Sequence, residues 1–175
     1  VVGISDYQNE EITDLQYADK DALLFSEYLK TREDNKVKPE HITLLTNENA
    51  TAGKFISALY GLIEESKEGD EVIVYFSGHG DVESKTLSQP GFLLCWDAPS
   101  KIYMSGGTFS IVFLQEIIST LSIQNKSKVT IFTDACRSGK LAGNNISGTQ
   151  ATAANLSKQF ANEVKVLSCQ PNEYS

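Results

Sequence analysis

The stretch GDEVIVYFS, residues 69–77, constrains the fold of this chain more than any other segment. A near-continuous apolar run of this length without proline is typical of a central strand buried on both faces of a parallel sheet. Shorter runs rich in β-branched residues recur along the chain and are predicted to be further strands, at residues 1–5, 41–45, 129–133 and 164–167. Residues 92–96 predict a short extra strand or hairpin arm.

Helical periodicity separates most of these strands. Apolar residues recur at three- and four-residue spacing in three segments, which predicts three helices. Thr51 is expected to cap the second of them. The marker positions are Leu15, Ala18, Ala22, Phe25 and Leu29, then Phe55, Leu59, Leu62 and Ile63, then Ile111, Leu114, Ile118 and Leu121. Alternation of strands and helices predicts an α/β fold of three layers, with a mostly parallel sheet covered on both faces.

Length and composition narrow the class of protein. The 175 residues fit one domain over residues 1–175, and the net charge of −8 gives no basic surface for nucleic acid. Three widely spaced cysteines without a CxxC pair argue against zinc and favour a reducing cytoplasm. The sequence contains no run of eighteen apolar residues, so no membrane span is predicted. The abrupt start within a strand suggests a fragment of a longer protein.

Two predicted strands end in unusual polar residues. The central strand runs into Ser77, Gly78, His79 and Gly80, and the strand at 129–133 runs into Asp134 and Cys136. Because the carboxyl ends of parallel strands meet at one edge of a sheet, both motifs are expected at the same crevice. A glycine- and asparagine-rich segment at about 137–155 follows and predicts a mobile loop, with a weak helix at 156–160.

The pairing of Cys136 with His79 predicts nucleophilic catalysis. A thiol becomes an effective nucleophile when a nearby imidazole favours the thiolate, and the imidazole can then protonate a leaving amine. The backbone N–H groups of Gly80 and Cys136 are candidates for an oxyanion hole. The alternatives are a buried structural thiol and a glycine turn with an incidental histidine.

With these motifs the chain resembles the caspase–metacaspase superfamily of cysteine peptidases. Asp-Ala-Cys-Arg-Ser-Gly at 134–139 and Ser-Gly-His-Gly at 77–80 carry the resemblance, together with VVGISDYQ at the start and LQYADKDALLFSEYL at 15–29. The resemblance covers almost the whole chain. It implies a caspase-like three-layer α/β/α fold and a peptidase with Cys136 as nucleophile and His79 as its partner, of metacaspase or bacterial orthocaspase type.

The same resemblance implies the substrate. Caspases carry glutamine two residues before the cysteine and cleave after aspartate, whereas this chain has Asp134 there, as metacaspases that cleave after arginine or lysine do. In that family an aspartate of the first helix and the serine of Ser-Gly-His-Gly complete the pocket, which by motif position are Asp21 and Ser77. The alternative role of Asp21 is that of a partner for the helix dipole, and Asp19 is a competing candidate for the pocket. Two carboxylates would hold a basic side chain and repel an aspartate.

Further expectations follow from the family. Arg137 stands where many metacaspases have histidine. No cofactor is required, and calcium is a candidate activator, although the spacing of Asp81, Glu83 and Asp97 matches a calcium site poorly. The resemblance also implies a small subunit beyond this large-subunit portion, with its own strand and helices. Self-cleavage of the zymogen is expected at Lys140 and Lys158. The expected partners are basic polypeptide substrates and the small subunit, with neither nucleic acid nor membrane among them.

Other chemistries fit less well. A cysteine phosphatase needs arginine six residues after the cysteine, where this chain has Ala142. The phosphate-binding loop, dinucleotide and HExxH motifs are incomplete or missing. A non-catalytic caspase-like scaffold and a protease that cleaves after aspartate remain as the alternatives. Such scaffolds usually lose the cysteine or the histidine, and this chain keeps both.

Overall fold

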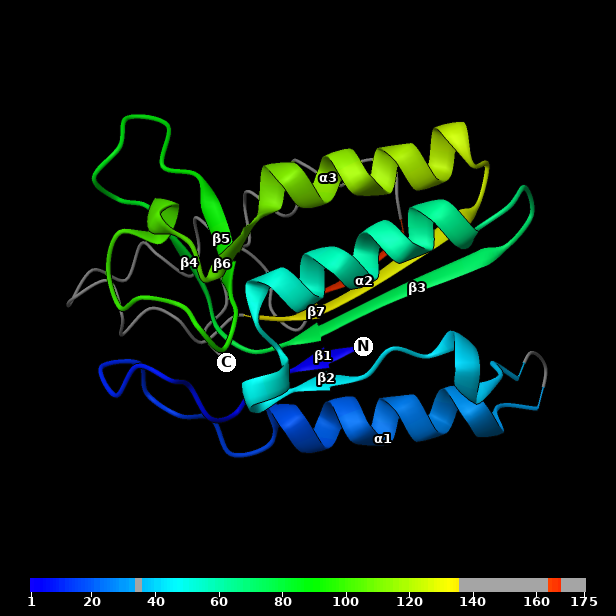
Figure 1. Ribbon diagram of the computed structural model, residues 1–175, viewed down its shortest axis with the longest axis horizontal. Coiled ribbons are helices and arrows are strands. Elements are labelled where there is room, and N and C mark those ends of the chain that lie inside the picture. Colours follow the sequence, from blue (N-terminus) through cyan, green and yellow to red (C-terminus); the bar gives the residue numbers. More distant parts are fainter. Residues whose placement is uncertain (34–35, 136–163, 168–175) are drawn as a thin grey trace.

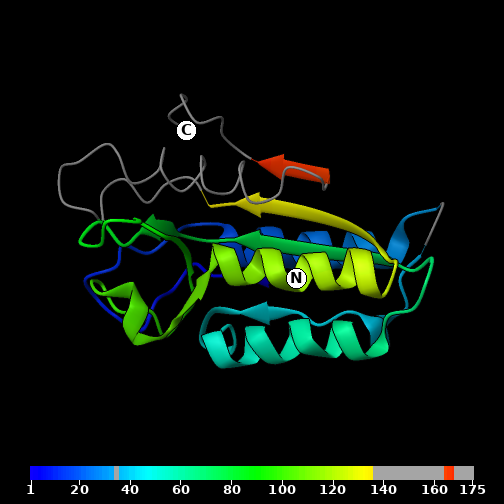
Figure 2. The same cartoon turned by 90° about the horizontal axis from the view of Figure 1, so that it is seen from above.

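The computed structural model describes residues 1–33, 36–135 and 164–167. Five parallel strands form the central sheet in the order β2-β1-β3-β7-β8. Helix α1 lies on one side of this sheet and helices α2 and α3 lie on the other (Figures 1 and 2). The bounds are β1 Val2–Gly3, α1 Ala18–Thr31, β2 Leu45–Thr46, α2 Ala52–Glu65, β3 Glu71–Ser77, α3 Ile111–Ser119, β7 Lys128–Asp134 and β8 Val164–Leu167. The predicted α/β class and the three layers are confirmed.

The two faces of β3 show how the layers are joined. Phe76 stacks on Phe55 of α2, with ring centroids 6.0 Å apart, whereas its neighbour Tyr75 stacks on Phe25 of α1 at 4.4 Å. Successive residues of a strand point to opposite faces, so these two contacts fix α1 and α2 on opposite sides of the sheet. The α2 side holds most of the large buried side chains, including Phe76, Leu114 and Ile131.

The face of β3 toward α1 is less covered than the sequence suggested. Ile73 and Tyr75 are only half-buried, while Val72, Val74 and Phe76 on the other face are buried. The prediction that this strand is buried on both faces is therefore wrong for the described part of the chain. The reason is that α1 is the one described helix on that side, and it packs mainly against β1 and the end of β3.

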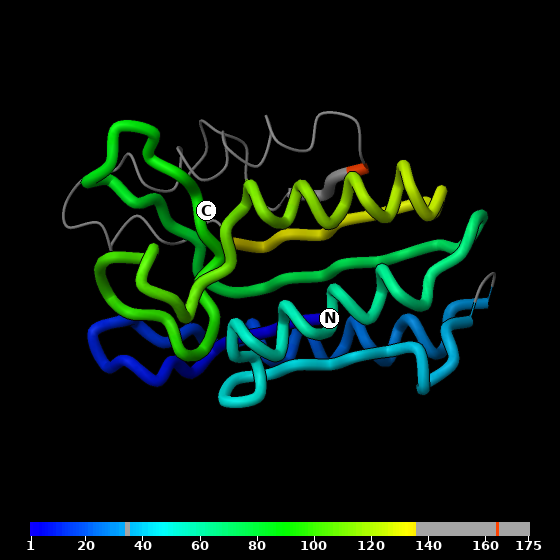
Figure 3. Tube along the Cα trace, turned by 45° about the horizontal axis from the view of Figure 1, so that its top comes forward, coloured from blue at the N-terminus to red at the C-terminus, as the bar shows by residue number. Residues whose placement is uncertain are grey.

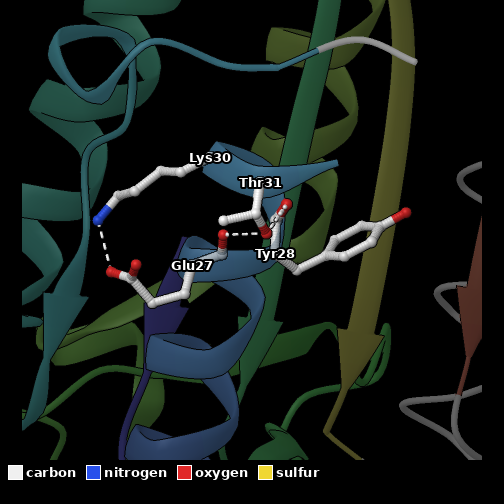
Figure 4. A network of polar contacts seen from close by, with 4 residues as sticks. All are labelled: Glu27, Tyr28, Lys30 and Thr31. Carbon is white, nitrogen blue, oxygen red and sulfur yellow. Dashed lines mark hydrogen bonds and ion pairs between the residues drawn. The ribbon is translucent and has the colours of Figure 1, made fainter. Parts of the chain in front are cut away.

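A glycine allows α1 to approach the sheet closely. A Cβ atom on Gly3 would lie 2.3 Å from the carbonyl oxygen of Ala18 and 2.4 Å from Cβ of Ala22. Only a residue without a side chain fits beneath the first turns of α1. At the far end of α1, Thr31 donates a hydrogen bond to the carbonyl of Glu27 at 3.0 Å, and Lys30 pairs with the Glu27 carboxylate (Figure 4).

A second, smaller sheet lies beyond the carboxyl end of β3. It is antiparallel, in the order β4-β5-β6, with bounds β4 Gly80–Val82, β5 Gly91–Leu94 and β6 Thr108–Ser110. The sequence predicted one arm near β5 and missed the other two strands. Loop 4–17 lies at the same end of the molecule (Figure 3) and is joined to the segment after β5 by Gln8 N–H, which donates to Trp96 O at 3.0 Å.

Several predicted bounds need correction. His41 does not open a strand: it ends a 3₁₀ turn, Pro39–His41, and β2 begins only at Leu45. Pro39 presets the turn conformation at its first position, which delays the strand. Thr51 caps α2 as predicted and accepts a hydrogen bond from Lys54 N–H. A single π-helical turn, Thr120–Gln124, follows α3. The predicted loop at 137–155 and helix at 156–160 lie outside the described residues.

Candidate active site

His79 is held at the end of β3 by loop 4–17. It is 4 % exposed, and its Nε2 lies 2.7 Å from the carbonyl oxygen of Thr13. A carbonyl oxygen only accepts hydrogen bonds, so Nε2 carries the proton and Nδ1 has the free lone pair. Nδ1 is buried and has no hydrogen-bond partner among the described residues. Burial also lowers the pKa of His79, which keeps the ring neutral and able to accept a proton.

Tyr7, in the same loop, holds the backbone of His79. The Tyr7 hydroxyl accepts the His79 N–H at 2.8 Å, and the two rings lie 5.2 Å apart. Tyr7 is 5 % exposed, and burial raises the pKa of its hydroxyl. Its own N–H donates to the side chain of Asp14 at 3.2 Å. One loop thus fixes the histidine both at its backbone and at one ring nitrogen.

The backbone N–H of Gly80 is directed away from β5. Leu94 N–H donates to His79 O at 2.9 Å, so these two residues form a hydrogen-bonded pair of the antiparallel ladder. Such pairs alternate with pairs that exchange no hydrogen bonds, and the next pair is Gly80 with Leu93. The N–H of Gly80 is therefore not used by β5, which suits a donor for an oxyanion.

Ser77 and Asp134 lie side by side at the carboxyl edge of the sheet. They are paired in register between β3 and β7, and Gly78 N–H donates to Asp134 O at 3.0 Å. Ser77 is 2 % exposed, whereas Asp134 is exposed. Both point to the α1 face, because Tyr75, two residues before Ser77, packs on Phe25 of that helix.

Asp21 faces the same rim from α1. It lies in the first turn of the helix, as expected, next to Ala18 and Ala22, which contact Gly3. Gly3 is in turn paired with Ser77, so the first turn of α1 lies over the end of β3. The carboxylates of Asp21 and Asp134 both raise the pKa of Tyr75, after the larger effect of burial. The structure therefore brings Asp21, Ser77 and Asp134 to one place, which we call the acidic rim.

Asp19, the competing candidate, has a different environment. Its Oδ1 accepts a hydrogen bond from the Ser5 hydroxyl at 2.7 Å, and its Oδ2 accepts one from the Asn47 amide at 3.4 Å. The hydrogen bond from Ser5 is the main reason that the pKa of Asp19 is lowered. Both of its oxygens hold β1, α1 and the turn after β2 together, which leaves Asp21 as the carboxylate available at the rim.

The three acidic residues considered for calcium are already engaged. Asp81 is 1 % exposed and accepts a hydrogen bond from the Tyr103 hydroxyl at 2.6 Å, and Glu83 accepts one from the Tyr103 N–H at 3.1 Å. Asp97 accepts the N–H of Ala52 at the start of α2. In the described part of the chain, no group of three or more acidic, histidine or cysteine side chains is arranged to hold a metal ion. These residues do not fit a calcium site.

The family is decided by a match over the whole sequence. The family model described as the caspase domain matches residues 1–175. The chain belongs to the caspase domain family. This is a family of cysteine peptidases, so the resemblance found in the motifs is confirmed at the level of the family.

Solved structures agree on the fold of this caspase domain. A crystal structure of a protein from Geobacter sulfurreducens matches with a TM-score of 0.62 and 18 % sequence identity, over 81 % of this chain and 50 % of that one. This chain thus spans half the length of the protein it matches. None of the curated proteins matches the chain. No helix within residues 1–33, 36–135 and 164–167 is long and apolar enough to cross a membrane.

Some features of the caspase domain site were not predicted from the sequence. Thr13 acts through its backbone carbonyl, which has no signature in the sequence, and Tyr7 was noted only as part of the opening motif. Tyr75 and Gly3 follow from the strand register once it is known. Cys136, Arg137, Lys140 and Lys158 lie outside the described residues.

Proposed function

We propose that this caspase domain is a cysteine endopeptidase that hydrolyses peptide bonds after arginine or lysine. The observation that carries the proposal is Nδ1 of His79, a buried lone pair on a neutral imidazole that has no hydrogen-bond partner among the described residues and whose other nitrogen is fixed by Thr13. A buried acceptor without a partner is rare and costs stability, so it marks a site kept for a proton donor. Cys136 follows β7 by two residues and supplies that donor in the proposal.

The steps follow from these groups. Nδ1 of His79 takes the thiol proton of Cys136, and the resulting thiolate attacks the carbonyl carbon of the scissile bond. The N–H groups of Gly80 and Cys136 stabilise the oxyanion. His79 then gives its proton to the leaving amine, which departs and leaves an acyl-enzyme. Water, losing a proton to His79, hydrolyses the thioester and restores the thiol.

The acidic rim supports the choice of substrate. Asp134 is exposed and Asp21 is partly exposed, and neither side chain makes a hydrogen bond or ion pair with another described residue. Two carboxylates at one place attract a guanidinium or ammonium group and oppose an aspartate side chain. The proposed substrates are therefore polypeptides with accessible basic residues.

The first test compares two fluorogenic peptides that differ only before the scissile bond, one with arginine and one with aspartate. We expect hydrolysis of the arginine peptide and its loss in Cys136→Ala and in His79→Ala. Hydrolysis of the aspartate peptide alone would reject the basic specificity but keep the protease. A wild-type protein that cleaves neither peptide and reacts with a thiol-directed electrophile no faster than free cysteine would favour a scaffold.

Self-processing is the second part of the proposal. Cleavage after Lys140 and Lys158 would convert a zymogen into its subunits, and the small-subunit portion is then the partner of this domain. The full-length protein and its Cys136→Ala form are compared on a denaturing gel, with the termini of any fragments sequenced. Identical bands would reject self-processing, and fragments that end at other residues would reject these two sites.

A further inference from the structure

Tyr75 is a polar residue that the proposed mechanism does not use. It lies on β3 two residues before Ser77, so both side chains point to the α1 face. Its ring stacks on Phe25, with centroids 4.4 Å apart and an interplanar angle of 20°. Phe132, its register partner on β7, lies 5.2 Å from Phe25 and completes an aromatic layer. The ring is therefore fixed, but the residue is only half-buried.

Tyr75 lies beside the acidic rim, on the same face of β3 as Ser77. Asp21 is one helical turn before Phe25 on α1, and Asp134 is two residues after Phe132 on β7. The two carboxylates thus lie on the elements that flank the Tyr75 ring, and Ser77 is two residues further along the same face of β3. Burial first, and then these two charges, raise the pKa of Tyr75, so the hydroxyl stays protonated at neutral pH.

We propose that Tyr75 is a specificity-determining residue whose ring forms the inner wall of the acidic rim and whose hydroxyl contacts the terminal nitrogens of a bound arginine or lysine. The inference rests on the proposed function and adds a contact to it. A protonated phenol can accept a hydrogen bond from a cationic nitrogen and donate its own proton to Ser77 or to a carboxylate. It offers this acceptor without adding a third negative charge to the rim.

The hydroxyl matters more for arginine than for lysine. A guanidinium has five N–H donors in fixed directions, so losing one acceptor leaves a donor that cannot turn to another partner. An ammonium group rotates and can replace the lost contact with water. Tyr75→Phe keeps the ring and its stacking on Phe25 but removes the hydroxyl. It should therefore weaken arginine substrates more than lysine substrates.

The test measures kcat and KM of Tyr75→Phe on matched arginine and lysine peptides. We expect kcat/KM for arginine to fall about tenfold, mainly through KM, and the fall for lysine to be about threefold. Tyr28→Phe is the matched control, because Tyr28 belongs to the same aromatic cluster but is 57 % exposed on α1 (Figure 4). That variant should stay within about twofold of wild type for both peptides.

A readout in the wild-type protein covers the case in which the variant does not fold. With ¹³C-labelled tyrosine, saturation with benzamidine, a small amidinium probe, should shift the ring signal of Tyr75 and leave Tyr28 in place. Unchanged arginine-to-lysine selectivity in folded Tyr75→Phe, or an unmoved Tyr75 signal, would overturn the inference. A wild-type enzyme that cleaves neither basic peptide would instead overturn the proposed function, so the two failures are distinguishable.

Discussion

Two pairs of acidic residues lie beyond the carboxyl ends of the strands, and their surroundings differ. Asp21 and Asp134 form the acidic rim on the α1 face and are accessible to solvent. Asp81 and Glu83, on and just after β4, are 1 % and 5 % exposed and share Tyr103 as a hydrogen-bond donor. Asp81 also accepts Val82 N–H, and Glu83 accepts Lys85 N–H.

This difference separates carboxylates that can bind a ligand from those that support the fold. The carboxylates of the buried pair already accept hydrogen bonds from internal donors, and burial raises the pKa of Asp81. The rim pair has no such internal donors among the described residues, and the proposed function assigns it to a cation of the substrate. The calcium candidates were acidic residues close in sequence to the histidine, whereas the basic ligand that we propose would be held by residues brought together from α1 and β7.

Replacing a rim carboxylate should give the largest effect. Asp134→Asn keeps the size of the side chain but removes one charge. We expect kcat/KM for the arginine peptide to fall about 10- to 100-fold, because a hydrogen bond to a charged group contributes about 1.5–3 kcal/mol. Asp81→Asn, the matched change at the buried pair, should leave the ratio of arginine to aspartate cleavage unchanged. Equal loss of selectivity in both variants would contradict the distinction between the pairs.

The acidic rim depends on the position of α1, so Gly3→Ala, a change at the contact between α1 and the sheet, should disturb the rim. The added Cβ would meet the Ala18 carbonyl at 2.3 Å, which forces the helix that carries Asp21 away from β3. We expect the free energy of unfolding to fall by about 1–3 kcal/mol, as at other overpacked sites. Denaturant unfolding measures this, and benzamidine affinity should fall in the same variant.

Gly53→Ala is the control for that change, since a Cβ at Gly53 on α2 meets no atom within 4 Å. It should stabilise the protein or leave it unchanged, because alanine favours a helix over glycine. A Gly3→Ala protein as stable as wild type, with unchanged benzamidine affinity, would show that α1 adjusts without moving Asp21.

The sequence predicted the residues at strand ends better than their surroundings. His79, Ser77 and Asp134 follow strongly apolar strands, so period and length alone place them at one edge. The small sheet was largely missed, since β4 and β6 have three residues each and depend on pairing with β5 rather than on their own pattern.

The contacts that define the site depend on long-range register and on the backbone. Thr13 lies 66 residues from His79 in the sequence and contributes a carbonyl oxygen that every residue type has. Tyr75 belongs to an apolar run that predicted burial on both faces, and only the placement of α1 shows it half-exposed at the rim. Sequence patterns identify strands and their ends, but side-chain partners across elements require the packed structure.

The buried pair should make stability depend on pH in a defined direction. The pKa of Asp81 is raised in the folded state, so the folded protein holds this proton at pH values where the unfolded chain has lost it. Stability from this group is present below about pH 4, the unfolded pKa, and is lost as the pH rises through the folded pKa. Asp81→Asn should remove this fall, as followed by urea unfolding between pH 4 and 7.

Tyr103→Phe tests the same pair from the donor side. Losing the hydroxyl removes the 2.6 Å hydrogen bond to Asp81 and should cost about 1–3 kcal/mol above the folded pKa of Asp81, where the carboxylate is left without that donor. The cost should shrink as the pH is lowered and Asp81 is protonated. No cost at any pH would show that Tyr103 supports the fold through its ring alone, and a cost that does not vary with pH would show that the hydrogen bond is equally strong to the protonated and the ionised Asp81.

Asp19 should give the smallest effect on stability, and its dependence on pH should have the opposite sign to that of Asp81. Its pKa is lowered in the folded state, chiefly by the Ser5 hydroxyl, so the unfolded chain binds this proton more readily. Its stabilisation is fully present above about pH 4 and is lost as the pH falls through the folded pKa. Because Asp19 is partly exposed, solvent screening keeps the contribution below about 1 kcal/mol.

Ser5→Ala tests this contribution. The loss of stability at low pH should be smaller in Ser5→Ala than in the wild type, and it should be unchanged in Asp81→Asn, since Ser5 contacts Asp19 and not the buried pair. If Ser5→Ala instead weakened arginine cleavage as strongly as Asp134→Asn, Asp19 rather than Asp21 would belong to the rim.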